Sequence, residues 1–468
     1  MDISKIKKIY MIGIKGVGMT MLGQFLAEKG FSVSGSDTEE KFMTEKALAK
    51  AGIQVIEGFN ENNIPPDADL IIHSIAYNPE NNSEVAKAQT GKIKTLNYGE
   101  AAGMFFNEYY GIAVAGSHGK TTTTAWLGYV LLKSGFHPNV MAGSHVPQFG
   151  GTSIAGDSDY LVAEVDEYGN KFQYYRPRVA LLNNIDYDHP DFFPTPDDYE
   201  KVFIEFIKKI PKKGFLVANF DDPVIKKIAR VNCLGKVISY ALNDSEADYI
   251  ASEITQKGDR QYFRVMAEDN DLGIFSIRLS GRHNVFNALA VIAAAVELSA
   301  GLSDIREHLG EFAGTDRRME FLGEFNGAAL YDDYAHHPTE IKTTLEGVRE
   351  SHPDKKLIVV FHPHTFTRTK ALLNDFARSF AAAHELIVLD IYGSAREKQG
   401  GVHSKDLIEK IILRNAETGN TTQTVRHIAT LAECEKYLSG RLGRGDLCLL
   451  MGAGDVFRIG ENLVTRNS

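Results

Sequence analysis

Short apolar runs alternate with amphipathic stretches along this chain. Near its start, the β-type run "IKKIYMIGI" precedes "MTMLGQFLAEKG", whose apolar residues recur with helical spacing, and a second β-type run, "FSVSGSD", follows. Apolar runs of this length, bounded by glycine or polar residues, are typical of buried strands. The pattern therefore predicts a strand, a turn, a helix and a second strand, which is the repeating unit of an open α/β sheet.

The same alternation begins twice more along the chain. It restarts at "YYGIAVAGSHGK" and again at "GAALYDDYAHHPTEI", after which come strand-like runs such as "KLIVVFHPH" and "GDLCLLMGAGDV". A chain of 468 residues is too long for one ordinary core. We therefore predict an α/β protein of three domains: a Rossmann-like domain at 1–108, a central P-loop ATPase-like domain at 109–320, and a second Rossmann-like domain at 321–468.

The start of the second module predicts a loop that binds a nucleoside triphosphate. A β-type run leads into this loop and a helical pattern leaves it; the loop residues are Gly116, Ser117, His118, Gly119, Lys120, Thr121 and Thr122. Glycines let backbone N–H groups approach phosphates, a lysine neutralises phosphate oxygens, and a threonine hydroxyl can bind Mg²⁺. The spacing is a short variant, because G-x-x-x-x-G-K-[ST] would require glycine at Val114. A glycine-rich helix cap with a surface lysine is the alternative.

The first glycine turn, "GIKGVGM", gives a weaker signal. Gly13, Gly16 and Gly18 follow the spacing G-x-x-G-x-G, which differs from the dinucleotide fingerprint G-x-G-x-x-G. The helix that begins here still offers backbone amides to a diphosphate, and Asp37, at the end of the next strand, can accept from a ribose or a base. A tight turn without a ligand and a nicotinamide dinucleotide site remain the alternatives.

Acidic residues and histidines follow two strands of the central module. "EVDE" supplies Glu164, Asp166 and Glu167, and "NNIDYDH" supplies Asp186, Asp188 and His189. Because ligands gather at the carboxyl ends of strands in open α/β sheets, both segments are expected near the phosphates bound by Lys120. Oxygen donors suit Mg²⁺, and a histidine can complete a second metal site.

Later segments add further candidates. Asn287 lies inside an apolar helix, where an amide needs a reason such as contact with an adenine edge, and Arg317 and Arg318 are candidates for a clamp on a phosphoryl group. A cluster of polar residues at a strand-to-helix junction, and an arginine beyond the next strand, complete the set: Asp332, Asp333, Tyr334, His336, His337 and Arg368. Arginine suits recognition of a carboxylate.

Composition narrows the classes of partner. The formal net charge of −10 disfavours nucleic acid as a binding partner. The cysteines, Cys233, Cys434 and Cys448, lie far apart and form no CxxC pair, which fits a reducing cytoplasm and supports neither a disulfide framework nor a zinc site. The longest apolar helical stretch, "NALAVIAAAVEL", is far shorter than the ~20 residues of a membrane span. We expect a cytoplasmic protein, monomeric or a homodimer, without membrane or nucleic-acid partners.

Taken together, these segments resemble the Mur ligase family, whose ATP-dependent members add amino acids or peptides to the UDP-muramyl precursor of bacterial peptidoglycan. The markers occur in the family's order over essentially the whole chain: "GIKGVGM", "GSHGKTTTT", "EVDE", "NNIDYDH", "HNVFNALA", "RRME" and "DDYAHHPTE". The resemblance implies an ATP-dependent carboxylate–amine ligase that uses Mg²⁺ and acts in cell-wall synthesis.

The resemblance also implies a role for each matching residue. A first group would face the UDP moiety in the N-terminal domain: Gly16, Val17, Gly18, Met19, Asp37 and Ser74. Residues 116–122 would hold ATP, with Lys120 on its phosphates, Asn287 on adenine, Arg318 on the γ-phosphate and Asp333 on the ribose. Thr121, Glu164 and His189 would bind Mg²⁺, and Tyr334, His336 and Arg368 would form the amino-acid pocket. Lys120, Glu164, His189 and Arg318 would be the catalytic set.

Different segments of the chain resemble two branches of this family. "DDYAHHPTE" and "FHPHTFTRT" resemble the branch that joins L-alanine to UDP-N-acetylmuramate, whereas "HVPQFGGTS" and "EVDEYGNKF" are closer to the murein tripeptide ligases that recycle cell-wall peptides. Because the third domain receives the amine in this family, we predict L-alanine. A nicotinamide-dependent oxidoreductase and a non-catalytic nucleotide-binding scaffold are the rival interpretations.

Overall fold

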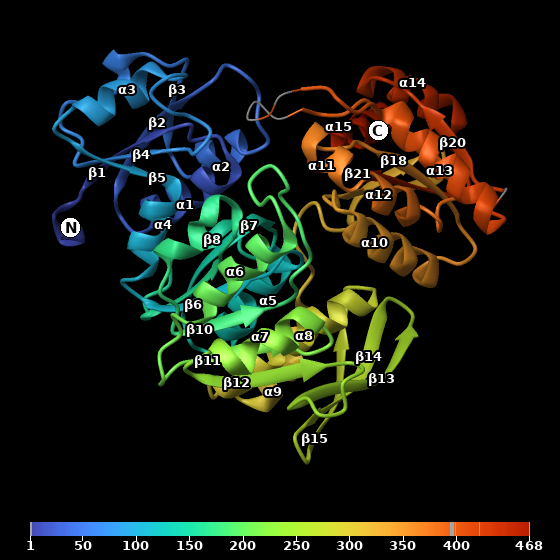
Figure 1. Cartoon of the computed structure of the whole chain (residues 1–468), viewed down its shortest axis with the longest axis horizontal. Helices are drawn as coiled ribbons and strands as arrows, with labels where there is room; N and C mark the ends of the chain where they lie inside the picture. Colours follow the sequence, from blue (N-terminus) through green and yellow to red (C-terminus); the bar gives the residue numbers. More distant parts are fainter. Residues whose placement is uncertain (1, 394–396, 398, 421, 468) are drawn as a thin grey trace.

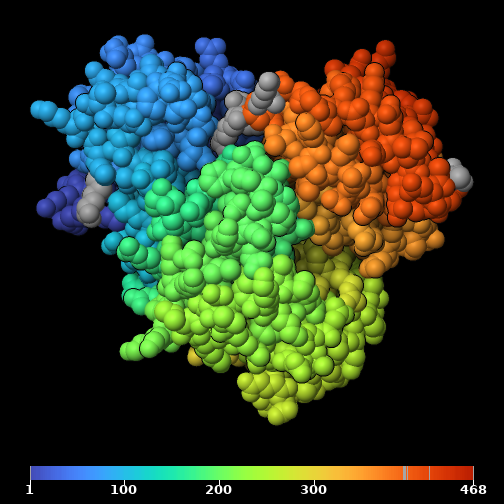
Figure 2. Space-filling view, in the orientation of Figure 1, coloured from blue at the N-terminus to red at the C-terminus, as the bar shows by residue number. Residues whose placement is uncertain are grey.

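The chain folds around three separate β-sheets that succeed one another along the sequence. The computed structural model describes residues 2–393, 397, 399–420 and 422–467. In Figure 1 the first sheet lies in the blue lobe, the second in the cyan-to-yellow lobe and the third in the orange-to-red lobe. Figure 2 shows the first and third lobes on either side of the central one. The predicted three-domain α/β class is confirmed.

The N-terminal sheet is wholly parallel, in the order β3-β2-β1-β4-β5. Its central strand β1 is buried over its last four residues, as expected of a strand covered by helices on both faces. The strands are β1 (Lys8–Ile12), β2 (Ser32–Asp37), β3 (Gln54–Glu57), β4 (Leu70–His73) and β5 (Lys94–Asn97), and the helices are α1 (Val17–Glu28), α2 (Glu45–Lys50), α3 (Ser83–Thr90) and α4 (Tyr98–Phe106), with short 3₁₀ turns at Ile3–Lys5 and Glu61–Asn63.

The central sheet has a parallel middle and antiparallel ends, in the order β15-β14-β13-β12-β11-β10-β6-β9-β7-β8. Its strands are β6 (Tyr110–Ala115), β7 (Asn139–Val146), β8 (Gly151–Ile154), β9 (Tyr160–Glu164), β10 (Val179–Leu182), β11 (Phe215–Asn219), β12 (Lys236–Ala241), β13 (Tyr249–Lys257), β14 (Arg260–Ala267) and β15 (Asn270–Ile277). Its helices are α5 (Lys120–Lys133), α6 (Pro196–Ile207), α7 (Pro223–Asn232), α8 (Arg282–Glu297) and α9 (Leu302–Glu311), with a 3₁₀ segment η3 at Tyr168–Tyr174. The β13–β15 meander, which projects at the bottom of Figure 1, was not predicted from the sequence.

The third sheet has the order β16-β17-β21-β18-β19-β20 and is parallel except for the pair β16–β17. Its strands are β16 (Glu320–Phe325), β17 (Ala328–Asp333), β18 (Lys356–Phe361), β19 (Glu385–Val388), β20 (Thr424–His427) and β21 (Asp446–Met451). Its helices are α10 (Pro338–Ser351), α11 (Phe366–Ala371), α12 (Leu373–Ser379), α13 (Ser404–Thr418), α14 (Leu431–Arg441) and α15 (Phe457–Asn467). Strand β21, "DLCLLM", is buried at every residue, as its continuous apolar run predicts.

In the central and third domains, the carboxyl ends of parallel strands carry the predicted ligand-binding loops. The loops after β6, β9 and β10 carry the phosphate loop and the two acidic segments, and the loop after β17 carries the tyrosine–histidine cluster. In parallel sheets this edge collects loops that bind ligands. Among the described residues, no helix is long and apolar enough to cross a membrane.

Candidate active site between the three domains

Two cavities flank the phosphate loop. One, of about 650 Å³, is lined by the central and third domains, and the other, of about 560 Å³, is lined by all three. Gly119, Arg318 and Glu340 line both cavities, so these residues form part of the wall between them. Clefts between domains are common ligand sites, and this wall is where a group could pass from one bound molecule to another.

The phosphate loop has the expected strand–loop–helix setting, between β6 and α5. Gly119 caps the helix with φ +76°, and a Cβ there would come 2.7 Å from the side-chain oxygen of Asn287, so glycine is required both by conformation and by space. Lys120 Nζ donates to the carbonyls of Gly116 (2.5 Å) and Ser117 (3.0 Å). The lysine therefore lies over the loop whose bound anion it is predicted to neutralise.

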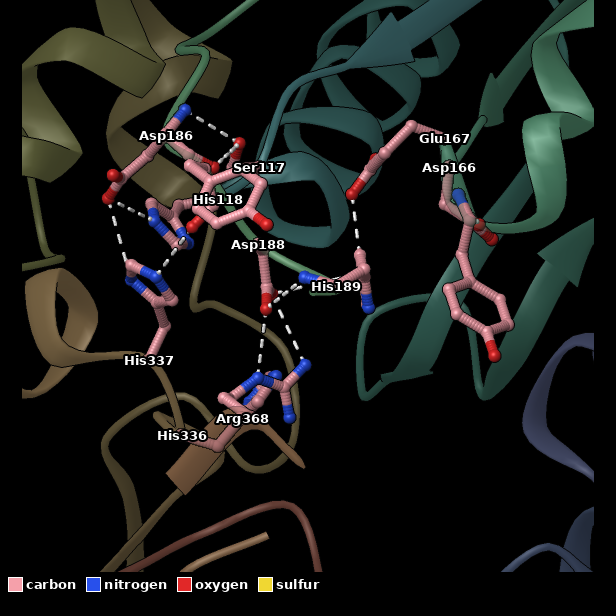
Figure 3. A network of polar contacts seen from close by, with 12 residues as sticks. Ser117, His118, Asp166, Glu167, Asp186, Asp188, His189, His336, His337 and Arg368 are labelled. Carbon is pink, nitrogen blue, oxygen red and sulfur yellow. Dashed lines mark hydrogen bonds and ion pairs between the residues drawn. The ribbon is translucent and has the colours of Figure 1, made fainter. Parts of the chain in front are cut away.

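The predicted metal-binding residues gather in the second cavity. It is lined by Thr121, Glu164 and His189, and the Glu164 carboxylate accepts from the Gly143 N–H at 2.9 Å. His189 Nε2 lies 3.4 Å from Glu167. Figure 3 marks this contact with a dashed line. Because these side chains follow β9 and β10, the structure brings together the two acidic segments as expected from the sequence.

Glu167 is a buried carboxylate beside the loop lysine. Its Oε2 lies 3.6 Å from Lys120 Nζ, and its Oε1 accepts from the Tyr199 hydroxyl at 3.0 Å. Burial by itself would raise the pKa of this carboxyl, but the charges of Lys120 and His189 outweigh burial and lower the pKa to about 2. Glu167 is therefore ionised in the folded protein. It was predicted near the site, but without a role of its own.

His118 of the phosphate loop is hydrogen-bonded to acids of two domains. Its Nε2 lies 3.0 Å from Asp186, and its Nδ1 lies 3.3 Å from Glu340 of α10. Burial disfavours the charged imidazole, but the hydrogen bonds and charges of Asp186 and Glu340 outweigh burial and raise the pKa of His118 to about 9. Protonated His118 thus links the phosphate loop to the third domain.

Asp186 is the centre of a second link between these domains. It accepts from the Thr339 hydroxyl at 2.5 Å and lies 3.4 Å from His337 Nδ1, a contact drawn in Figure 3. His337 caps α10 together with Glu340, so the helix that follows the strand-to-helix junction begins directly against the central domain. The cluster of acids and histidines at this junction therefore joins domains as well as lining a cavity.

Arg368, which the resemblance assigns to the amino-acid pocket, contacts the central domain. It is buried and lines neither cavity, and its guanidinium makes a two-point ion pair with Asp188, at 2.9 and 3.2 Å (Figure 3). Burial would raise the pKa of Asp188, but Arg368 holds it well below its usual range. In this conformation the arginine fork is occupied by a carboxylate of the central domain.

The other two residues predicted for the amine do line the second cavity. They are Tyr334 and His336. The ring Nδ1 of His336 lies 2.9 Å from the Tyr334 carbonyl, and burial lowers the pKa of His336 to about 4, so its imidazole is neutral. A neutral imidazole next to a cavity can accept a hydrogen bond from an amine.

The residues predicted to contact adenine and ribose line the first cavity. Asn287 projects from α8 toward the phosphate loop, and Asp333 ends β17. The Asp333 carboxylate accepts from the backbone N–H groups of Met319 and Ala335, which fixes its position.

The two adjacent arginines before β16 have different surroundings. Arg318 lies 3.6 Å from Glu340 and lines both cavities. Its neighbour Arg317 is instead buried in an ion pair with Asp332, at 2.8 Å. Both arginines line the second cavity, but of the two only Arg318 also lines the first.

Only part of the predicted UDP-binding set reaches a cavity. Val17 and Gly18, at the start of α1, line the second cavity, whereas neither cavity is lined by Gly16, Met19, Asp37 or Ser74. Asp37 is 2% exposed and accepts from the backbone N–H groups of Lys15 and Thr38. In this structure Asp37 holds the first glycine turn together.

Glu340 was not among the predicted site residues. It lines both cavities, lies within ion-pair distance of His118 and Arg318, and has a pKa well below its usual range because nearby positive groups outweigh its burial. In the sequence, Glu340 stands three residues after His337, which is where a glutamate that caps the start of a helix is expected. Helix capping therefore explains this glutamate without any role in a ligand site.

Models of one protein family match almost the whole chain. The Mur ligase family catalytic domain matches residues 8–110, the Mur ligase middle domain matches 114–295, and the Mur ligase glutamate ligase domain matches 317–454. The UDP-N-acetylmuramate–L-alanine ligase of Desulfitobacterium hafniense is 40% identical over 97% of this chain and 99% of its own length. The chain belongs to the Mur ligase family.

Other relatives of this Mur ligase agree with that placement. The UDP-N-acetylmuramate–L-alanine ligase of Clostridium acetobutylicum is 37% identical over 99% of this chain and 98% of its own length. Among solved structures, the UDP-N-acetylmuramate–alanine ligase of Thermotoga maritima has a TM-score of 0.81, at 24% identity and covering 98% and 99% of the two chains. A murein peptide ligase from Psychrobacter arcticus has a TM-score of 0.74 at 25% identity, covering 98% of each chain. The three-domain fold is therefore that of the family.

Proposed function

We propose that this Mur ligase joins L-alanine to the carboxylate of UDP-N-acetylmuramate, using ATP and passing through an acyl phosphate, in the synthesis of peptidoglycan precursor. The observation that carries the proposal is the pair of cavities on either side of one phosphate loop. Gly119 and Arg318 line both cavities, and Lys120, directly after Gly119, lines the second. The groups suited to phosphoryl transfer therefore lie at the boundary between the cavities.

One bound molecule would occupy each cavity. ATP would occupy the first, with its adenine near Asn287, its ribose near Asp333 and its terminal phosphates on residues 116–122. The UDP-sugar would occupy the second, with its nucleotide end near the start of α1, and the amine would lie near Tyr334 and His336. The γ-phosphate and the sugar-linked carboxylate would then meet at the shared wall.

The residues at that wall suit transfer of a phosphoryl group to a carboxylate. Both reacting groups are anions, so Lys120 and Arg318 would offset the charge that otherwise keeps them apart. The carboxylate oxygen attacks the γ-phosphorus and ADP leaves. The amine then attacks the activated carbonyl carbon, phosphate leaves, and the amide forms with loss of an amine proton. Domain contacts around the cavities would exclude water from the acyl phosphate.

The donors around the second cavity fit a magnesium ion. Thr121 supplies a hydroxyl and Glu164 a carboxylate, and the buried Oε2 of Glu167 has no hydrogen-bond partner among the described residues. His189 is a less simple ligand, because Asp188 and Glu167 raise its pKa against the effect of burial, so a metal ion would have to displace its proton. When bound, Mg²⁺ would neutralise phosphate charge and orient the phosphates.

L-Alanine is favoured over a peptide as the amine. The curated relatives at 37–40% identity, which match this chain over almost its whole length, are named for L-alanine. Membership of the Mur ligase family leaves the oxidoreductase interpretation without support.

We further propose domain boundaries near residues 108 and 320. Residue 108 lies between α4 and β6, and residue 320 is the first residue of β16.

The test is a coupled assay of ADP release with ATP, Mg²⁺ and UDP-N-acetylmuramate, in which L-alanine, glycine, L-serine or the tripeptide L-Ala-γ-D-Glu-meso-diaminopimelate is offered as the amine. We expect L-alanine to give the highest kcat/KM.

Arg318→Ala should lower the rate by about 10³ or more, as loss of an arginine that stabilises phosphoryl transfer does. Lys133→Ala, at the exposed end of α5, is the matched control for Lys120→Ala and should keep full activity. A preference for the tripeptide would overturn the assignment of the amine, and full activity of Lys120→Ala would overturn the site.

A further inference from the structure

Three side chains of metal-binding type gather in the third domain, outside both cavities. They are Asp390, His403 and His427, and each offers a ligand atom within 4.8 Å of the others. Among the described residues, one other group contains two histidines, His118 and His337 with Asp186, but His118 there is protonated because of its acidic neighbours. The cluster in the third domain has no assigned part in the ligase reaction.

The backbone holds all three residues in place at one edge of the sheet. His427 is the last residue of β20 and pairs in register with Val388 of β19, two residues before Asp390. The Asp390 N–H donates to the Ala429 carbonyl at 3.1 Å. Helix α13 begins against the same loop, because the Ser404 hydroxyl donates to the Leu389 carbonyl at 2.6 Å. Ligands fixed by strands and a helix start need little reorganisation on binding.

The side-chain atoms face one another with suitable polarity. His427 Nε2 lies 2.8 Å from Asp390 Oδ1, and the rings of His403 and His427 have centroids 5.7 Å apart. His403 Nδ1 accepts from the Lys405 N–H at 3.2 Å, which leaves its Nε2 as the ligand atom. In a tetrahedral zinc site, bonds of about 2.0–2.1 Å set the donors roughly 3.3 Å apart. The ligand atoms lie within 4.8 Å of one another, and the His403 side chain is exposed, so a metal ion can reach the cluster from solvent.

We propose that Asp390, His403 and His427 bind a divalent transition-metal ion of the zinc type, with its remaining position open to solvent. Two imidazole nitrogens and one carboxylate oxygen suit Zn²⁺ and disfavour Mg²⁺, which takes oxygen ligands. Metal binding at His427 Nε2 uses the ring tautomer whose proton is on Nδ1, and the ion takes the place of the hydrogen bond between Nε2 and Asp390. By joining three segments distant in sequence, the ion stabilises this edge of the third domain.

The test is isothermal titration of ZnCl₂ into the full-length, tag-free, metal-stripped chain. We expect one saturable site whose affinity falls at least about tenfold in His403→Asn and in His427→Gln, since even outer partners of metal ligands are worth about 10–100-fold in affinity. Asparagine at position 403 keeps a side-chain cap for α13. His137→Gln, outside the cluster, is the matched control and should bind as the unaltered chain does.

Two results would overturn the proposal. One is the absence of saturable zinc binding by the unaltered chain; the other is unchanged affinity in both variants, which would assign the zinc to another group such as His118, Asp186 and His337. Millimolar MgCl₂ in the calorimeter cell should not weaken zinc binding at the proposed site. The circular dichroism spectrum of each variant, compared with that of the unaltered chain, establishes that weaker zinc binding does not result from unfolding.

Discussion

His118 shows how one side chain can make contact between domains depend on pH. Its partners are Asp186 and Glu340, and the His337 ring lies 4.7 Å from its own, so acids from two domains and a second imidazole face it. The pKa of His118 rises from 6.5 to about 9 on folding, because the two acids outweigh burial. A raised pKa means that the folded protein holds the proton more tightly than the unfolded chain.

The stabilising effect of this proton is therefore complete below pH 6.5 and is lost as the pH rises through about 9. We expect the difference in thermal midpoint between the unaltered chain and His118→Gln to be largest at the lower pH and to shrink toward the higher one. The rise in the pKa of His118 corresponds to about 3 kcal/mol of stability. Differential scanning calorimetry across this range measures it, with His137→Gln as the control. A difference in thermal midpoint that stays constant with pH would contradict the raised pKa of His118.

At the scale of elements, helix α5 connects the phosphate loop to the core of the central domain. Its Trp126 is fully buried, donates from Nε1 to the Leu309 carbonyl at 3.1 Å, and stacks on Phe312 with ring centroids 5.2 Å apart. The loop at the start of α5 thus rests on a helix that is fixed from behind by α9 and the segment after it.

Trp126→Ala is expected to cost about 3–5 kcal/mol of stability, because it leaves a cavity and an unpaired buried carbonyl. Trp126→Phe should cost clearly less, since it keeps the stacked ring and loses mainly the hydrogen bond. Far-UV circular dichroism in increasing urea compares the two variants with the unaltered chain. Because the chain has one tryptophan, the emission of the unaltered protein also reports directly on α5. Equal losses in both variants would show that ring packing does not fix the helix.

At the scale of the whole molecule, buried contacts hold the third domain against the central one. The ion pair between Arg368 and Asp188 joins residues 180 positions apart, and both side chains are nearly inaccessible to solvent. A charge buried without its partner is strongly unfavourable. The arrangement of the two domains in Figure 1 therefore depends on this pair as well as on the contacts of Asp186.

Arg368→Ala should open the molecule, because leaving Asp188 buried and unpaired costs about 3–5 kcal/mol. We expect a larger radius of gyration by small-angle X-ray scattering of the free protein. Lys227→Ala breaks an exposed ion pair with Glu200 inside the central domain and should leave the scattering unchanged. An unchanged scattering profile for Arg368→Ala would mean that the other contacts between the central and third domains hold them together without this ion pair.

Much of the fold was predictable because its signals are local. The run "GIAVAGSHGKTTTT" contains its strand, its turn glycines and its helix start within consecutive residues, so β6, Gly119 and α5 appear where expected. The β13–β15 meander was missed because its strands are half exposed and lack the continuous apolar runs of the parallel strands. The roles of Asp37 and Ser74 stay predictions, and Asp37 has a structural use that a motif cannot reveal.

The sequence by itself determined three α/β units and one phosphate loop, since hydrophobic periodicity and glycine spacing act over short stretches of chain. Only the tertiary structure decided which charged groups share a site. Glu340 meets His118, and Arg368 meets Asp188, because the third domain packs against the central one. Such pairings depend on the orientation of whole domains, which no local pattern encodes.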